Sequence, residues 1–159
     1  MLLGLGAGGG RHTPYAAEQL VFGRPVLGDT ARRAALEAAV ATIRSVWTGT
    51  IGGVGGFLRP DPPPPIIVGG FGPKMAELAG RVGDGVNLPG GPRLARLVEV
   101  ARASRAASAR RPSAFLVTVS SDLSAAARER LKELDVDRAV VFVTPPFASH
   151  VRGLAASPR

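Results

Sequence analysis

The stretch IIVGGFGPKMAELAGRVGDGVNL (Ile66–Leu88) decides the fold class of this 159-residue chain. It opens with three β-branched residues, Ile66–Val68, turns at Gly69–Gly72, and continues as an apolar-periodic segment, Pro73–Val82. A second short strand-like run, Asp84–Leu88, follows directly. A buried strand, a glycine turn, a helix with proline at its first position and a second strand form one strand–helix–strand unit. The stretch therefore predicts two parallel strands joined by a crossover helix.

The same alternation extends to both sides of this unit. Further strands are predicted at Leu2–Gly8, Ala114–Val119 and Ala139–Val143, and further helices at Thr30–Thr48, Arg93–Ala107 and Ser124–Leu134, with a short helical tail. Arg11–Gly28 is predicted to be irregular, and residues 49–65 to be a Gly- and Pro-rich connector. The prediction is one α/β domain over residues 1–159, with five parallel strands buried on both faces. This alternation fits an open sheet and part of a barrel equally well.

The composition excludes several kinds of site. The chain has no cysteine, which excludes disulfides, thiolate metal sites and a cysteine nucleophile. Its two histidines, His12 and His150, are far apart, so no metal centre is predicted. No apolar run approaches the roughly 20 residues of a membrane span, and the first ten residues lack the basic start of a signal peptide. We therefore expect a cytoplasmic protein that does not bind membranes.

The formal charge of +8 does not predict a nucleic-acid partner. Only Lys74 and Lys132 are lysines, and the arginines are scattered through Ala-rich helical stretches. Aromatic residues, which stack on bases, make up 5% of the chain. Scattered charge of this kind is typical of solvated helix surfaces, so we expect no specific binding to nucleic acid.

The turn at Gly69–Gly72 is a candidate anion site. The first amides of the following helix have no acceptor within the helix and lie at the positive end of its dipole. Glycines at 69, 70 and 72 would let an anion approach the backbone, and Lys74 adds a positive charge. The alternative is a tight turn in which these glycines supply positive φ angles. The residues alone leave both interpretations open.

A second glycine-rich loop, Gly4–Gly10, fits the dinucleotide pattern G-x-G-x-x-G at positions 4, 6 and 9. It raises the alternative of a Rossmann-type protein that binds NAD(P). In a Rossmann unit the third glycine lies inside a helix, whereas here Arg11–Pro14 follows and the next predicted helix begins near residue 30. The spacing therefore argues against this alternative, which strand order would decide.

Four segments, taken together, resemble the bacterial luciferase-like monooxygenase family. They are LGLGAG (Leu3–Gly8), FGRP (Phe22–Pro25), LEAAVATIRSVWTG (Leu36–Gly49) and PPIIVGGFGPKMAELAGRVGDGVNL (Pro64–Leu88). They occur in the family's order, and the deazaflavin-dependent branch, which uses coenzyme F-420, is the most similar. The resemblance is clearest over residues 2–90.

The resemblance implies part of a (β/α)8 TIM barrel. The five predicted strands would be strands four to eight, and the first three βα units would be absent from this chain. The implied function is that of an oxidoreductase or monooxygenase: hydride transfer to or from a deazaflavin, or FMN-dependent oxygenation, with a small organic molecule as substrate. The alternatives are a catalytically inactive part of a barrel or a subunit that pairs with another chain. We accordingly expect either homo-oligomers or pairing with a missing barrel half.

The resemblance also implies the residues that bind the cofactor, coenzyme F-420 or FMN. Its phosphate would lie against the loop after the fifth strand and the end of the sixth, and its ring system beside the end of the fourth. The implied residues are Gly6, Gly8, Gly69, Gly70, Phe71, Gly72, Pro73, Leu88, Pro89 and Gly90. Sugar-phosphate dehydrogenases of the deazaflavin branch have an acidic residue where this chain has Gly9, so no catalytic residue is carried over. His12 and Glu18 lie nearby in sequence and are expected to be solvated.

Overall fold

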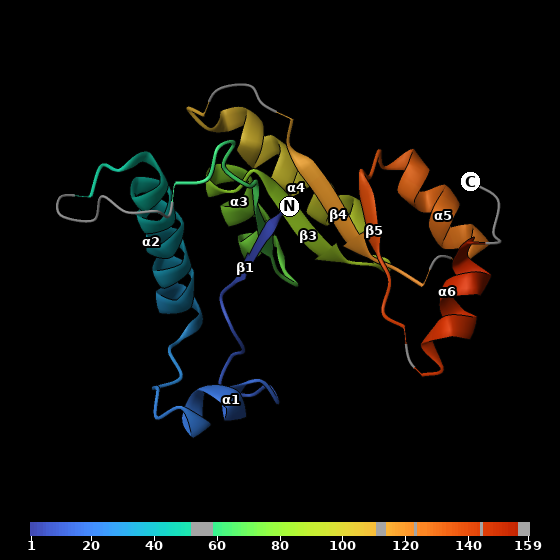
Figure 1. The fold of residues 1–159 in the computed structure, drawn as a ribbon, viewed down its shortest axis with the longest axis horizontal. Helices are drawn as coiled ribbons and strands as arrows, with labels where there is room; N and C mark the ends of the chain where they lie inside the picture. The colour runs from blue at the N-terminus through green and yellow to red at the C-terminus, as the bar shows by residue number, and fades with distance from the viewer. Residues whose placement is uncertain (52–58, 111–113, 123, 144, 156–159) are drawn as a thin grey trace.

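The computed structural model describes residues 1–51, 59–110, 114–122, 124–143 and 145–155. Strands and helices alternate along this part of the chain (Figure 1). In chain order the elements are β1 (Leu3–Gly6), α1 (Ala16–Val21), α2 (Asp29–Thr48), β2 (Ile66–Gly69), α3 (Pro73–Val82), β3 (Gly85–Pro89), α4 (Leu94–Ala107), β4 (Leu116–Ser120), α5 (Ala125–Glu133), β5 (Arg138–Val140) and α6 (Phe147–Ala155). The predicted α/β class is confirmed.

All strands of the sheet are parallel, and their spatial order is β1-β2-β3-β4-β5. Each strand is thus added beside the one before it, as in the wall of a barrel. A Rossmann sheet instead has its first strand in the middle, because the chain returns to add strands on the other side. The Rossmann-type alternative is therefore wrong, and the sheet is consistent with part of a luciferase-like barrel.

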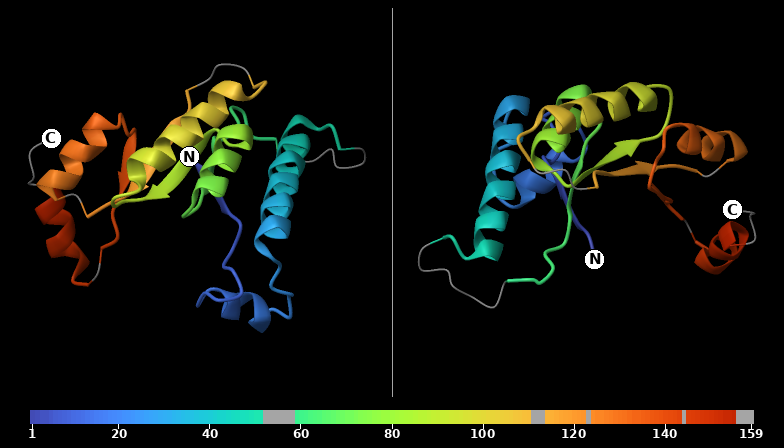
Figure 2. Two further views of the ribbon diagram at one scale, coloured as in Figure 1. Left: turned by 180° about the vertical axis from the view of Figure 1, so that it is seen from behind. Right: turned by 90° about the horizontal axis from the view of Figure 1, so that it is seen from above.

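The hydrophobic core lies between the sheet and its helices. Helices α3 and α4 cover one face of the sheet. The sheet lies in front of these helices in Figure 1 and behind them in the left view of Figure 2. Alternate strand residues point to this face, because successive side chains of a strand point to opposite sides. The core comprises Ile66, Val68, Val86, Leu88, Val117 and Val119 from the strands, with Leu36 and Val40 of α2, Ala76 and Ala79 of α3, and Leu94, Leu97, Val98 and Ala101 of α4. We call the opposite side of the sheet its open face.

Two aspartates join the starts of neighbouring strands by the same pair of hydrogen bonds. Asp84, directly before β3, accepts from the amide of Ile66 (2.9 Å) and donates its own amide to the Ile66 carbonyl (2.7 Å). Asp137, directly before β5, accepts from the amide of Val117 (2.7 Å) and donates to the Val117 carbonyl (3.0 Å). The two pairs fix the registers of β2 with β3 and of β4 with β5. They lie at the end of the sheet away from the glycine loops.

The edge strands differ from the prediction. Strands β2 to β4 are largely buried, but β1 alternates half-buried and exposed residues and β5 is exposed throughout. Each edge strand has a single neighbouring strand within the described residues, so burial on both faces was a wrong expectation for both. Strand β5 also ends at Val140 rather than Val143. The amide of Ser121, just after β4, bonds the Val140 carbonyl, and pairing stops there.

The segment 11–28 was predicted to be irregular, but it contains the six-residue helix α1. This helix projects beyond the end of β1, away from the sheet (Figure 1). Of the predicted connector, residues 49–51 and 59–65 form neither helix nor strand, and residues 52–58 lie outside the described part of the chain. No described helix is long and apolar enough to cross a membrane.

Candidate functional site

The glycine-rich loops after β1, β2 and β3 meet at the carboxyl edge of the sheet. Gly6 lies opposite Gly69, and Gly69 lies opposite Asn87. The contacts continue past the strand ends: the Gly70 amide donates to the Asn87 carbonyl (3.2 Å), and the Gly90 amide donates to the Ser120 carbonyl (3.0 Å). The residues that the resemblance implied for cofactor binding are therefore gathered at one edge, where ligands bind in parallel α/β folds.

The amino end of α3 presents unused hydrogen-bond donors at this edge. Gly72 precedes the helix in an extended conformation, and Pro73 occupies its first turn. The amides of Met75 and Ala76 both donate to the Gly72 carbonyl (3.0 and 3.1 Å). Within the described residues, the amides of Phe71, Gly72 and Lys74 have no acceptor. These three donors lie at the positive end of the α3 dipole, which is the arrangement that binds anions.

The three glycines of this loop do different things. None has a positive φ; among the described glycines that conformation is found at Gly8, Gly23, Gly49 and Gly91. The tight-turn interpretation of the loop is therefore wrong. A Cβ at Gly70 would overlap the Cβ of Met75 and lie 2.8 Å from its Cγ, so Gly70 is needed for α3 to pack. A Cβ at Gly72 would have nothing within 4 Å, so Gly72 leaves open the approach to the helix amides.

The other implied cofactor residues lie in two environments. Phe71 is exposed at 71% of its surface and Pro73 is exposed, both beside the α3 amides. Pro89 and Gly90 lie at the end of β3 on the same edge. The Leu88 side chain is fully buried in the core on the helix side, so only its backbone is available to a ligand.

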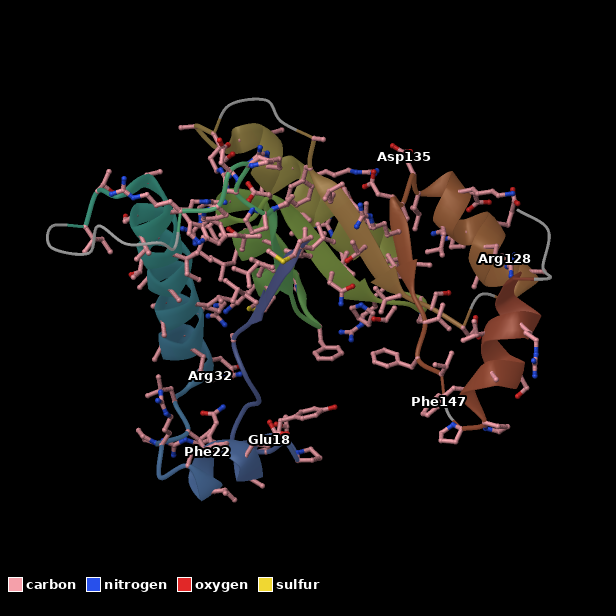
Figure 3. All side chains as sticks on the ribbon, viewed as in Figure 1. Glu18, Phe22, Arg32, Arg128, Asp135 and Phe147 are labelled. Carbon is pink, nitrogen blue, oxygen red and sulfur yellow. The ribbon has the colours of Figure 1, made fainter. Side chains whose placement is uncertain are left out.

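The loop after β1 is held by an arginine that the sequence analysis did not single out. Arg32 of α2 donates to the carbonyls of Gly8 and Ala7, the latter at 3.4 Å, and to the Asp29 carboxylate at 2.6 Å (Figure 3). The hydrogen bond and charge of Arg32 lower the pKa of Asp29. A Cβ at Gly8 would lie 2.7 Å from the Gln19 side-chain nitrogen. Gly8 is exposed, but the end of the Gln19 side chain lies against the position that a Cβ would take.

A cleft of about 430 Å³ opens beside this loop. Its walls come from β1 and the loop after it, from α1 and the segment after it, and from α2. They include Leu5, Gly6, Arg24, Arg32 and Leu36. Gly6 therefore borders both this cleft and the open face of the sheet.

A polar row crosses the open face one layer below the loops. The register places Gly6, Gly69, Asn87, Thr118 and Arg138 directly opposite one another on successive strands. Thr118 is buried, and its hydroxyl has two acceptors within hydrogen-bond distance, the Asn87 Oδ1 (2.8 Å) and the Val86 carbonyl oxygen (3.1 Å). The next row toward the amino ends is apolar, with Ile67 and Leu116 against Gly85. The open face thus changes from apolar to polar toward the loops.

The polar row was missed by the sequence analysis, although a signal for it existed. Asn87 interrupts the apolar strand run Gly85–Leu88, and Thr118 interrupts Leu116–Val119. A polar residue inside a buried strand needs a partner. Two such interruptions on adjacent strands therefore indicate a pair.

His12 and Glu18, which lie near the first glycine loop in sequence, are not part of the polar row. His12 and Glu18 are both exposed, and Glu18 lies on α1, away from the sheet (Figure 3). Within the described residues, no group of three or more histidine, aspartate or glutamate side chains could hold a metal ion. The side chains of the polar row are an amide, a hydroxyl and a guanidinium, which bind and orient rather than exchange protons near neutral pH.

The family described as luciferase-like monooxygenase matches residues 1–153. No curated protein matches the chain. The matched range includes every strand of the sheet, the α3 amides and the polar row. The chain therefore belongs to the luciferase-like monooxygenase family.

Proposed function

We propose that the amino end of α3 binds the phosphate of a flavin-type cofactor, and that the chain serves in oxidoreduction of a small organic substrate. The observation that carries this proposal is the group of amides at Phe71, Gly72 and Lys74, which have no acceptor within the described chain. The open approach over Gly72 and the exposed Lys74 side chain support an anionic ligand. Family membership supports a flavin or deazaflavin as the molecule that carries the anion.

Among flavin-type cofactors we favour coenzyme F-420, because the four sequence segments are most similar to the deazaflavin branch; FMN is the second candidate. Both carry a phosphate on the side chain of a flat ring, so one site at α3 serves either. Bound there, the cofactor would supply hydride transfer or, in the case of FMN, oxygen activation. The chain would contribute the phosphate donors and the surface on which the ring is oriented.

Substitution of Gly72 tests the phosphate site. Gly72 has φ −141° and ψ 168°, a conformation that any residue adopts, and its Cβ position is open, so Gly72→Val leaves the fold intact. The valine side chain would stand between an anion and the α3 amides. We expect affinity for FMN or coenzyme F-420, measured by fluorescence titration, to fall at least tenfold.

Gly28→Val is the matched control. Gly28 precedes α2 in an extended conformation, and its Cβ position also has nothing within 4 Å. The control should bind both cofactors as the unsubstituted chain does. Equal affinity in Gly72→Val and the unsubstituted chain, or no binding of either cofactor to the unsubstituted chain, would contradict the proposal.

A further inference from the structure

We propose that Asn87 binds the cofactor ring, with its side-chain Nδ2 donating a hydrogen bond to a ring carbonyl oxygen, and that Thr118 positions Asn87 for this contact. The inference rests on the proposed function and adds a ligand-binding residue on the open face, distinct from the phosphate donors of α3.

The open face offers a flat surface beside Asn87. On the β1 side of Asn87 the row continues as Gly69 and Gly6, which have no side chains. A Cβ at Gly6 would meet nothing within 4 Å, and one at Gly69 would come no closer than 3.8 Å, to the Leu5 carbonyl oxygen. Apart from each glycine and its chain neighbours, no atom of the described residues lies within 3.8 Å of these two Cβ positions, so a planar ring can approach the backbone there.

Thr118 determines which end of the Asn87 amide faces this space. Its hydroxyl carries one hydrogen and lies nearer to the Asn87 Oδ1 (2.8 Å) than to the Val86 carbonyl oxygen (3.1 Å). Donation of that hydrogen to the nearer acceptor directs the Oδ1 toward β4. Thr118 is itself only 4% exposed and is fixed by the strands around it. The Nδ2 group is therefore directed away from Thr118, and within the described residues it has no hydrogen-bond acceptor.

The chemistry of this donor selects the acceptor. An amide Nδ2 carries two N–H groups and accepts nothing, so its partner must offer an oxygen or nitrogen lone pair. Flavins and deazaflavins share a pyrimidinedione ring with carbonyl oxygens on its edge. A ring lying on Gly6 and Gly69 brings that edge against Asn87, while the cofactor phosphate reaches α3 directly after β2.

Asn87→Asp tests the direction of the hydrogen bond. A carboxylate has nearly the same shape as the amide but cannot donate, and it repels a carbonyl oxygen. We expect affinity for FMN and coenzyme F-420, measured by fluorescence titration, to fall about tenfold or more. In difference infrared spectra of the bound cofactor, the ring carbonyl band should move to higher frequency, because it has lost a hydrogen bond.

Two substitutions of Thr118 test its positioning role. Thr118→Val keeps the shape and removes the hydroxyl, so the amide is no longer oriented, and we expect a several-fold loss of affinity with a broadened carbonyl band. Thr118→Ser keeps the hydroxyl and should restore both the affinity and the band. Denaturation midpoints of all variants, measured alongside, show that each is folded.

Failure of this inference differs from failure of the proposed function. One outcome overturns the role of Asn87 alone. In it, the unsubstituted chain binds the cofactor, Gly72→Val does not, and Asn87→Asp has the affinity and the carbonyl band of the unsubstituted chain. The phosphate site then stands. Equal behaviour of Thr118→Val and Thr118→Ser overturns the positioning role. If the unsubstituted chain binds neither cofactor, both proposals are overturned.

Discussion

The carboxylate of Asp84 connects three parts of the chain at the amino end of the sheet. It accepts from the Ile66 amide, from Arg44 of α2 at 3.1 Å and from Arg110 after α4. Burial by itself would raise the pKa of Asp84, but the Ile66 amide and the two guanidinium groups outweigh it and lower the pKa below its usual value. Asp84 therefore stabilises the fold in its ionised form.

Substitution of Asp84 should reveal this contribution. In Asp84→Asn the two arginines lose a carboxylate that is only 24% exposed, and we expect the free energy of unfolding to fall by about 2 kcal/mol at pH 7. Because the pKa is lowered in the folded state, the stabilisation is present above the unfolded pKa of about 3.9 and is lost as the pH falls through the folded pKa. Urea denaturation between about pH 7 and 3 should thus show a flatter pH dependence in Asp84→Asn.

Glu99→Gln is the comparison, because Glu99 pairs with Arg96 at the surface, where the two side chains are 66% and 70% exposed. Its effect should stay below about 0.5 kcal/mol. If Asp84→Asn lowered the free energy of unfolding by no more than Glu99→Gln does, the Asp84 carboxylate would not hold α2, β2 and the segment after α4 together.

Single residues also show where sequence reasoning stops. Gly70 and Gly72 look equivalent in GGFGP, yet one makes room for Met75 and the other opens the helix amides. The difference depends on where α3 lies over the loop, which no local pattern encodes. Asn87 and Thr118 were recognisable as polar interruptions, but their pairing depends on the register of β3 with β4.

At the scale of elements, helices α3 and α4 approach each other at Gly80. A Cβ at Gly80 would overlap the Ala101 carbonyl oxygen and lie 2.8 Å from the Arg105 amide nitrogen. The Ser104 hydroxyl donates to the Glu77 carbonyl at 2.7 Å across the same contact. A glycine inside a helix is normally unfavourable, so its presence is explained by this close packing.

Gly80→Ala should therefore destabilise the chain, against the helix propensity of alanine. Because the overlapping atoms are backbone, the helices must separate, and we expect a loss of about 1–3 kcal/mol in the free energy of unfolding. Gly153→Ala in α6 is the control, since a Cβ there meets nothing within 4 Å, and it should be neutral or slightly stabilising. A stabilising Gly80→Ala would show that the two helices can separate without cost.

Elements with strong local signals were predicted well, and those that depend on distant neighbours were not. Strand β2, helix α3 and strand β3 follow from apolar runs, glycine turns and a proline at the helix start. Helix α1 has only six residues and one buried side chain, Ala16, so it leaves almost no periodic pattern. Strand β5 is shorter than its apolar run because β4 stops offering hydrogen-bond partners.

At the scale of the whole molecule, the sheet has two unpaired edges within the described residues. Strands β1 and β5 each pair on one side only, and large apolar side chains such as Phe71, Phe142 and Val140 are exposed. An eight-stranded barrel would join these edges through further strands and would enclose the open face. Unpaired edge strands accept strands of other chains, because these satisfy the free backbone groups.

We therefore expect the 159-residue chain, studied by itself, to self-associate and to show no turnover with either cofactor. The open face would admit water and would lack orienting contacts on one side, so hydride transfer should be slower by orders of magnitude. Light scattering should show a mass that rises with concentration. A monodisperse monomer with turnover on the order of 1 per second would contradict this expectation.

A charged residue on edge strand β1 tests whether the sheet edge causes the association. A Cβ at Gly4 has nothing within 4 Å, so Gly4→Lys fits the folded chain and places a charge on the open face of β1. A lysine on an edge strand hinders the addition of a further strand, which is how natural edge strands avoid pairing. We expect Gly4→Lys to shift the light-scattering mass toward that of the monomer. Gly28→Lys is the control, because it makes the same substitution at an equally open position outside the sheet. It should associate like the unsubstituted chain. If both variants associate equally, the contacts come from exposed side chains such as Phe142 rather than from the edge of β1.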